Sequence, residues 1–247
     1  MFKLFSKSKS STVIPDLSLL KTDMHSHLLP GIDDGSPDIE TSLTLIRGMM
    51  ALGYTKLVTT PHIMWDMYKN TAEIILQKLE VVRDAVKAEG LNIEINAAAE
   101  YFLDDHVHGM VKNNEPLLTI SGNKVLVEFS LAYPSHSLKE ILFDMQMQNY
   151  QPVIAHPERY IYLENNKNFY EELRDIGCQF QLNLLSLGGY YGKSPQLLAD
   201  HLIKKGYYDL IGTDLHGFRH LEALNNPAIT SPMNKLLESG KIKNIEL

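Results

Sequence analysis

The chain has 247 residues, a formal net charge of −7, and 44% hydrophobic and 21% charged residues, which is ordinary globular composition. This composition excludes a disordered, collagen-like or low-complexity protein, and the acidic balance argues against a nucleic-acid partner because no basic excess can neutralise phosphates. The single cysteine, Cys178, excludes a disulfide framework and a thiolate zinc cluster. It fits a reducing compartment, so we expect a cytoplasmic protein.

The first 20 residues are predicted to form a flexible arm that precedes a single domain over residues 21–247. Residues 1–11 are basic and rich in serine, but they lack the apolar run of a secretory signal. A weak contact with a membrane surface is the alternative to a simple tail. The residues that would make it are Phe2, Lys3, Phe5, Lys7 and Lys9.

From Lys21 onward, short apolar runs alternate with longer segments of helical periodicity. The predicted strands are Lys21–His25, Lys56–Thr60, Ile93–Ala99, Lys124–Phe129, Pro152–Ala155, Gln179–Leu184 and Tyr208–Gly212. The predicted helices are Asp38–Leu52, Thr71–Ala88, Leu138–Gln148, Phe169–Ile176, Pro195–Lys205 and Pro232–Leu237. This α/β repetition predicts a parallel sheet with helical crossovers, and seven repeats favour a closed or nearly closed barrel. A doubly wound open sheet is the alternative, although no Gly-rich phosphate loop follows the first strand.

Histidines and carboxylates stand at the ends of six of the seven predicted strands. Because the carboxyl ends of parallel barrel strands meet on one face, we expect these side chains to converge there. Residues two apart in an extended chain point to the same side, as His25 and His27 do. With Asp34 from the loop after His27, the predicted metal ligands are His25, His27, Asp34, His62, Glu100, Glu128, His156, Asp214 and His216.

Nine such groups exceed the ligand number of one ion and suit two or three divalent ions. Imidazole and carboxylate ligands without thiolates favour manganese, iron or zinc. Clustered ions activate a water molecule and clamp both oxygens of an in-line displacement, which predicts phosphoester hydrolysis. Asp33 is interpreted as a loop or capping residue, although the choice of Asp34 over Asp33 rests on spacing alone. The histidines interpreted as structural or solvated are His106, His108, His136, His201 and His220.

Two of the five arginines flank these motifs, Arg159 in HPER and Arg219 in DLHGFR. A guanidinium binds a phosphoryl group in bidentate fashion, so Arg159 is predicted to bind phosphate and Arg219 is a second candidate. The alternative for Arg159 is an ion pair with Glu158 or another acid of the loop. A cysteine phosphatase is excluded, because Leu184 and not arginine stands six positions after Cys178.

The segments DMHSHLLPGIDDG, TTPH, AAAEYFLD, VLVEFS, VIAHPERY and IGTDLHG resemble the PHP (polymerase and histidinol phosphatase) superfamily. More narrowly, they resemble the bacterial manganese-dependent protein-tyrosine phosphatases of capsular and exopolysaccharide synthesis. The resemblance runs from about Lys21 to about Arg219 and implies a distorted TIM-like (β/α)7 barrel with a trinuclear site. The implied ligand sets are His25, His27, Glu100 and Asp214 for one ion, Glu100, Glu128 and His156 for a second, and Asp34, His62 and His216 for the third.

The resemblance also implies an enzyme that hydrolyses phosphotyrosine by a metal-activated hydroxide. The implied ion is manganese, with iron or zinc as substitutes, and the implied catalytic residues are Asp34, Arg159, His216 and Arg219. The implied partner is a bacterial tyrosine kinase. The first alternative is a phosphatase or phosphodiesterase of the same fold that acts on a small-molecule phosphate such as histidinol phosphate. The second is a non-catalytic metal-stabilised binding module, against which the complete ligand set argues.

Aromatic side chains near the predicted rim could face a phosphotyrosine ring, with ordinary loop packing as the alternative. They are Trp65, Tyr68, Phe102, Tyr133, Tyr160, Tyr190 and Tyr191. The sequence leaves the oligomeric state open.

Overall fold

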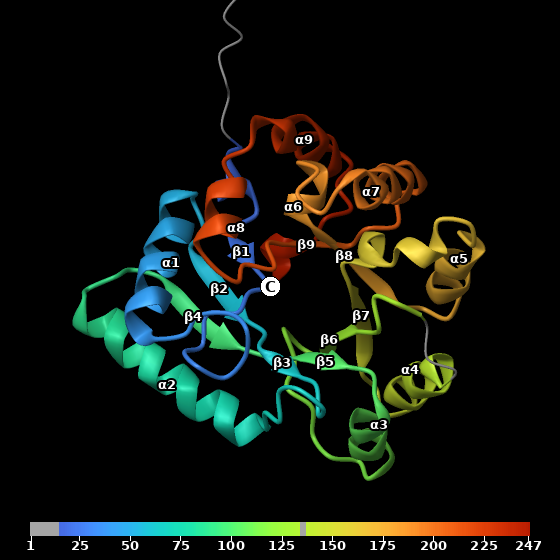
Figure 1. Ribbon diagram of the computed structural model, residues 1–247, viewed down its shortest axis with the longest axis horizontal. Helices are drawn as coiled ribbons and strands as arrows, with labels where there is room; N and C mark the ends of the chain where they lie inside the picture. The colour runs from blue at the N-terminus through green and yellow to red at the C-terminus, as the bar shows by residue number, and fades with distance from the viewer. Residues whose placement is uncertain (1–14, 134–136) are drawn as a thin grey trace, which may run out of the picture.

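The computed structural model describes residues 15–133 and 137–247 as an α/β domain in which strands circle a centre and helices surround them (Figure 1). The strands are β1 (Thr22–Asp23), β2 (Lys56–Thr59), β3 (His62–Ile63), β4 (Glu94–Ala97), β5 (Glu100–Phe102), β6 (Lys124–Glu128), β7 (Gln151–Ala155), β8 (Gln179–Asn183) and β9 (Leu210–Gly212). The α-helices are α1 (Ile39–Ala51), α2 (Ala72–Ala88), α3 (Asp105–Lys112), α4 (Leu138–Met147), α5 (Asn168–Asp175), α6 (Leu184–Leu187), α7 (Lys193–Lys205), α8 (Phe218–Ala223) and α9 (Thr230–Glu238). Short 3-10 helices are η1 (Leu17–Leu19), η2 (Pro157–Arg159), η3 (Ile161–Leu163), η4 (Pro227–Ile229) and η5 (Asn244–Glu246).

The strands pair in parallel throughout and form two ladders, β1-β2-β4 and β3-β5-β6-β7-β8-β9. The second predicted strand, Lys56–Thr60, corresponds to β2, and the short strand β3 follows it after Pro61, which has no N–H to donate to a ladder. The third, Ile93–Ala99, corresponds to β4, and β5 follows it after Ala98 and Ala99. Pairing continues across these breaks, because Ala98 N donates to Thr59 O at 2.8 Å and Glu100 N donates to Pro61 O at 3.1 Å. The strands therefore occupy the seven predicted positions around the ring.

The first and last strand positions lie side by side at a seam of the ring. An isolated parallel bridge joins Ser26 and Leu215, Asp214 N donates to His25 O at 2.7 Å, and His27 N donates to Leu215 O at 2.9 Å. This seam is an isolated bridge with its flanking bonds and not a continuous ladder, so the fold is a distorted barrel. The prediction of a single α/β domain with a parallel barrel-like sheet is confirmed.

Apolar side chains fill both the space between strands and helices and the inside of the ring. The inner cluster is Met24, Val58, Ala98, Ile120, Leu126, Val153, Ala155 and Leu210. Burial on both faces explains why the strands read as almost continuous apolar runs in the sequence. The outer helices bury one face each against the same strands, as α2 does with Ile75, Leu79, Val82 and Val86.

The ends of the described chain pack on the barrel. Leu17 and Leu20 are buried in the main core, so the structure includes residues 17–20 in the domain, where the sequence placed them in the arm. At the other end, Asn244 donates to Thr22 O at 3.0 Å and accepts from Ile211 N at 2.8 Å. The predicted membrane-contact residues of the arm lie outside the described residues. Within residues 15–133 and 137–247, no helix is both long and apolar enough to cross a bilayer, and the cytoplasmic location stays a prediction.

Candidate metal centre

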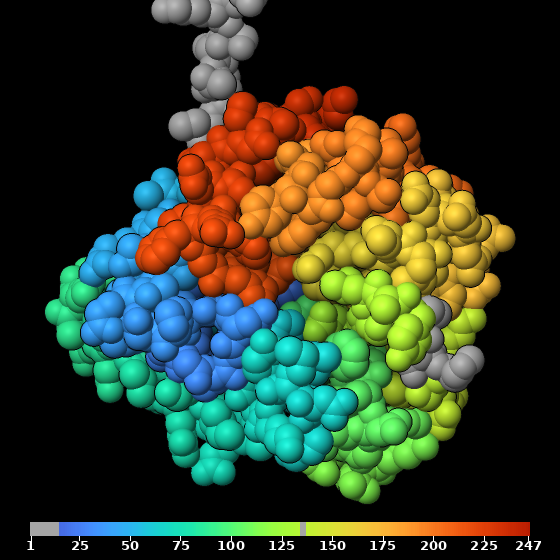
Figure 2. All heavy atoms as spheres, in the orientation of Figure 1, coloured from blue at the N-terminus to red at the C-terminus, as the bar shows by residue number. Residues whose placement is uncertain are grey.

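A cavity of about 600 Å³ opens where the carboxyl ends of the strands meet. In Figure 2, segments coloured blue, teal, light green and orange-red surround a hollow at the centre of the visible face. Seven of the nine predicted ligands line the cavity, and the other two, His25 and His27, are fully buried beside them. The lining ligands are Asp34, His62, Glu100, Glu128, His156, Asp214 and His216. The structure therefore brings all nine predicted side chains together.

The deepest group consists of His25, His27, Glu100 and Asp214, all buried. Nε2 of His25 lies 3.1 Å from Glu100 Oε2 and 3.3 Å from Asp214 Oδ1. Nε2 of His27 lies 3.4 Å and 3.5 Å from the same two oxygens. These four residues are the set that the resemblance implied for the first ion.

A second group surrounds Glu128. Nδ1 of His62 lies 3.0 Å from Glu128 Oε1 and 3.3 Å from Glu100 Oε2. Nε2 of His156 lies 3.0 Å from Glu100 Oε1 and 3.9 Å from Glu128 Oε2. The resemblance implied His156 with the two glutamates, and the structure adds His62 to this group.

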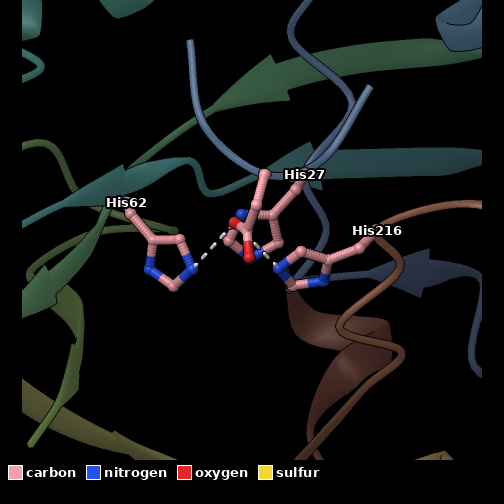
Figure 3. Close-up of side chains that lie close together, drawn as sticks. His27, His62 and His216 are labelled. Atoms are coloured by element: carbon pink, nitrogen blue, oxygen red, sulfur yellow. Dashed lines mark ion pairs between the residues drawn. The ribbon is translucent and has the colours of Figure 1, made fainter. Parts of the chain in front are cut away.

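The third group lies at the mouth of the cavity. Oδ1 of Asp34 is 3.5 Å from Nε2 of both His62 and His216. Figure 3 shows these two imidazoles on either side of a carboxylate, with the ring of His27 close by. His27 stacks on His216 with 3.8 Å between ring centroids. The geometry therefore favours Asp34, whose choice over Asp33 rested on spacing alone.

The donor set fits divalent ions. Two ligands at the usual bond length of about 2.1 Å from one ion lie roughly 3.0–3.5 Å apart in octahedral or tetrahedral geometry, and most pairs above fall in that range. Nδ1 of His62 is buried without a hydrogen-bond partner among the described residues, even though a Glu128 oxygen lies only 3.0 Å away. Such close but misaligned pairs are expected where both atoms face a shared cation.

The charges of the centre point the same way. Burial alone would lower the pKa of His25, but the carboxylates of Glu100 and Asp214 outweigh it and raise that pKa to about 9. Burial would likewise raise the pKa of Glu100, and the neighbouring histidines hold it well below its usual range instead. A hydrogen bond with His216 lowers the pKa of Asp34 to about 2. These carboxylates therefore stay ionised and need positive charge, which either protons on the histidines or divalent cations can provide.

Two residues that the sequence analysis did not assign to the site orient the deepest histidines. Oε1 of Gln181 is 2.9 Å from His25 Nδ1, and Oδ2 of Asp33 is 2.8 Å from His27 Nδ1. Partners of this kind fix the tautomer, so that Nε2 presents its lone pair to an ion. Gln181 is fully buried in β8, and this polar residue on an inward position was the available signal.

The backbone is unusual at two of the strand ends. His156 and Asp214 have φ values of 33° and 52°, in the left-handed region of backbone conformation that residues other than glycine rarely adopt. Such conformations persist where the surrounding structure imposes them, and they concentrate at functional sites. Close packing adds a further constraint, because a Cβ at Gly212 would lie 2.7 Å from His25 Cβ.

Arg159 lies at the wall of the cavity and Arg219 does not. Nη1 of Arg159 donates to Asp214 Oδ2 at 2.9 Å, and its guanidinium lies 4.4 Å from the ring centroid of Tyr191. Asn183 Nδ2 joins the pair by donating to Asp214 Oδ2 at 3.0 Å and to Tyr191 Oη at 3.1 Å. Arg219 is exposed on α8 and is not among the residues that line the cavity.

Glu158 does not pair with Arg159, so that form of the alternative interpretation is wrong. Its buried carboxylate accepts hydrogen bonds from Asn183 N at 3.0 Å, Ser186 Oγ at 2.8 Å and Tyr208 Oη at 2.9 Å. The acid that pairs with Arg159 is Asp214, itself one of the predicted ligands.

The remaining histidines lie mostly outside the centre. His106 stacks on Trp65, and His108 lies 3.4 Å from Asp144 at the surface between α3 and α4. His220 is the exception, because it lines the cavity with Nδ1 2.9 Å from Asp214 O. His136 lies outside the described residues.

Comparison with known proteins places the chain in a family. Residues 21–237 match the family described as "Capsular polysaccharide synthesis, CpsB/CapC". The chain is 25% identical over 201 residues to the tyrosine-protein phosphatase YwqE of Bacillus subtilis (strain 168), covering 80% of this chain and 78% of that protein. It is 30% identical over 200 residues to the tyrosine-protein phosphatase CpsB of Streptococcus pneumoniae, covering 78% and 82%.

Solved structures share the fold. One described as a unique metal-dependent tyrosine phosphatase, from work on YwqE of Bacillus subtilis and CpsB of Streptococcus pneumoniae, matches with a TM-score of 0.77 and 24% identity over 88% of this chain and 86% of that one. The lactonase Lmo2620 of Listeria monocytogenes matches with a TM-score of 0.53 and 10% identity over 94% and 92%. On the extent of the family match and the identity to CpsB, the chain belongs to the CpsB/CapC family of capsular polysaccharide synthesis.

Proposed function

We propose that the protein is a metal-dependent protein-tyrosine phosphatase. The observation that carries the proposal is the convergence of nine imidazole and carboxylate side chains, seven of which line one cavity together with Arg159. Membership of the CpsB/CapC family and relatives named tyrosine-protein phosphatases support it.

The three groups of donors would hold two or three divalent ions, with manganese preferred and iron or zinc as substitutes. Glu100 belongs to two of the groups and would bridge them. Such ions, when bound, supply the activation of water and the neutralisation of phosphoryl charge that hydrolysis of a phosphate ester needs.

Arg159 would bind the phosphoryl oxygens. Its Nη1 is engaged by Asp214, which holds the planar group at the cavity wall, and the remaining N–H donors are suited to a tetrahedral dianion. Stacking on Tyr191 limits rotation of the guanidinium, so less conformational entropy is lost when a phosphoryl group binds. Arg159 is thus a substrate-binding residue in this proposal.

His216 is proposed to supply the proton to the leaving oxygen, because it lies at the mouth with 19% of its side chain exposed. Asp34, which is 54% exposed and stays ionised, would assist by holding that imidazole, with Oδ1 3.5 Å from His216 Nε2. A phenol has a pKa of about 10, so the phenolate of tyrosine leaves more readily than an alkoxide and requires only modest help from an acid. This difference favours phosphotyrosine over phosphoserine as substrate.

The proposed partner is a bacterial tyrosine kinase of capsule or exopolysaccharide synthesis, acting in the cytoplasm. The support is the description of the family, which ties it to capsular polysaccharide synthesis.

The test compares phosphotyrosine peptide with phosphoserine peptide, histidinol phosphate and a phosphodiester, using protein purified with manganese and analysed for metal content. We expect turnover of phosphotyrosine peptide that a chelator abolishes and added manganese restores. Full activity in chelator, or a preference for histidinol phosphate, would contradict the proposal.

Two variants test whether the activity resides at the candidate metal centre. The double substitution His62→Ala with His216→Ala should abolish turnover and leave the circular dichroism spectrum of the barrel unchanged. His201→Ala on α7, a histidine outside the cavity, serves as the matched control and should keep wild-type activity. Equal activity in all three proteins would place the chemistry elsewhere.

A further inference from the structure

The two sides of the cavity differ in chemistry. The side formed after β7, β8 and β9 carries Arg159, Tyr191, Asp214, His216 and His220. The opposite side, formed by and after β3, β5 and β6, contributes His62, Glu100 and Glu128 to the centre, and the rest of its lining is mostly apolar. The apolar side chains, here called the apolar wall, have no role in the site so far and are Met64, Met67, Phe102, Phe129 and Leu131.

We propose that the apolar wall is the binding site for the aromatic ring of an aryl phosphate and that Met67 and Leu131 determine this specificity. The inference rests on the proposed phosphatase function. It adds a binding position for the aromatic ring of the substrate. The metal-ligand donors and the wall share one cavity, so a substrate whose phosphoryl group meets Arg159 must direct its remaining atoms along the cavity.

Exposure distinguishes the outer part of the wall from its base. Phe129 is buried and stacks on Tyr160 at 3.8 Å between centroids, so it forms a fixed base. Met67 and Leu131, by contrast, are 64% and 42% exposed while lining the cavity. Large apolar side chains held open to water beside a polar centre gain contact area when a ring covers them.

The residue types suit a flat ring. Methionine is flexible and its sulfur makes favourable contacts with aromatic rings, and Met64 and Met67 both border the cavity. Phe102 offers an aromatic partner for offset or edge contacts. A phosphoserine has no ring with which to fill this space. The contact area on the wall therefore favours phosphotyrosine, in addition to the preference that comes from the leaving group.

Binding of two non-hydrolysable probes tests the subsite. Phenylphosphonate carries the ring and methylphosphonate does not, and both present a phosphoryl dianion. With the metal-loaded full-length protein, calorimetry should give tighter binding of phenylphosphonate. Met67→Ala and Leu131→Ala should each weaken phenylphosphonate binding about fivefold, as expected for partial loss of apolar contact, and leave methylphosphonate unchanged.

Met147→Ala is the matched control, because Met147 is 71% exposed on α4 and does not line the cavity. It should bind both probes as the wild type does. Equal affinity of the wild type for the two probes, or equal weakening of both in the wall variants, would overturn the subsite.

The turnover assay on phosphotyrosine peptide distinguishes a failure of the aromatic subsite from a failure of the proposed function. Turnover of the peptide together with equal binding of the two probes would refute the subsite alone. Tight, wall-dependent binding of phenylphosphonate without turnover would support the subsite and refute the phosphatase.

Discussion

At the scale of single residues, Arg159 was the first candidate in the sequence for binding phosphate and Arg219 the second, and in the structure only Arg159 lines the cavity. Arg159→Ala should lower kcat/KM for phosphotyrosine peptide by about 100-fold, the scale observed when one preorganised donor to transition-state charge is removed. Arg159→Lys should recover only part of this loss, because an ammonium keeps the charge but not the planar fork. Steady-state kinetics on the two variants measures both effects.

Arg219→Ala is the companion measurement. Because Arg219 is exposed and outside the cavity, its loss should change kcat/KM by less than about threefold, as for an ordinary surface substitution. A loss as large as that of Arg159→Ala would instead support the role that the sequence predicted for Arg219.

The role of Asp33 is to orient His27 through one hydrogen bond. Its carboxylate accepts from Nδ1 of His27, which leaves Nε2 as the ligand atom. Asp33→Asn replaces one acceptor oxygen with a donor and disturbs that tautomer, so we expect the affinity for manganese to fall about 10- to 100-fold. Metal analysis after dialysis against graded manganese measures the change.

The control for Asp33 is Asp66→Asn, because Asp66 is an exposed aspartate that does not line the cavity. Its manganese affinity should equal that of the wild type. If Asp33→Asn also retains full affinity, Asp33 is a loop residue, as the sequence analysis interpreted it.

At the scale of elements, the short helix η2 places Arg159 and His156 on the cavity, and Glu158 holds it in position. Glu158→Ala removes an acceptor shared by Asn183 N, Ser186 Oγ and Tyr208 Oη and leaves buried donors unsatisfied. We expect a loss of roughly 3 kcal/mol in the free energy of unfolding, measured by urea denaturation.

Glu158→Gln keeps an acceptor oxygen and should cost clearly less than Glu158→Ala. Glu164→Ala, on an exposed position just beyond η3, should change the free energy of unfolding by about 0.5 kcal/mol or less. Equal stability of Glu158→Ala and Glu164→Ala would contradict the bracing role of Glu158.

The elements themselves were largely predictable, and the exceptions have local causes. Periodicity placed the strands and the longer helices within a few residues, because α1, α2 and α7 each bury a regular stripe of apolar side chains. The predicted strand Lys56–Thr60 ends directly before Pro61, and β3 beyond it was missed because two residues are too few to establish a strand period. Helices α6 and α8 escaped prediction because four or six residues are too few to establish a helical period.

The site was predictable as a set and not in its detail. Strand ends on one face of a parallel barrel suffice to bring His25, Glu100 and His216 together, and this needs only topology. Which ring nitrogen of each histidine faces the centre depends on partners such as Gln181, which come from other strands. No local pattern in the sequence carries that pairing.

At the scale of the whole molecule, the candidate metal centre spans the weakest seam of the barrel. Position one contributes His25 and His27, and the last position contributes Asp214 and His216, while an isolated bridge and its flanking bonds join the two. Ions held between these side chains would therefore cross-link the ends of the ring. The β6–β7 ladder, by contrast, is a continuous register from Lys124 to Val127 and does not depend on the centre for its pairing.

Removal of metal should consequently loosen one part of the fold more than the rest. A ligand present at 100 times its Kd stabilises the native state by about 2.7 kcal/mol, so chelation should lower Tm and added manganese should restore it. In hydrogen exchange, residues 24–28 and 213–216 should lose protection on chelation, whereas residues 124–128 and 151–155 should keep theirs, because exchange reports local opening. Equal loss of protection in both regions would mean that the ions stabilise the barrel as a whole. Unchanged protection at the seam would mean that its hydrogen bonds suffice without a cation.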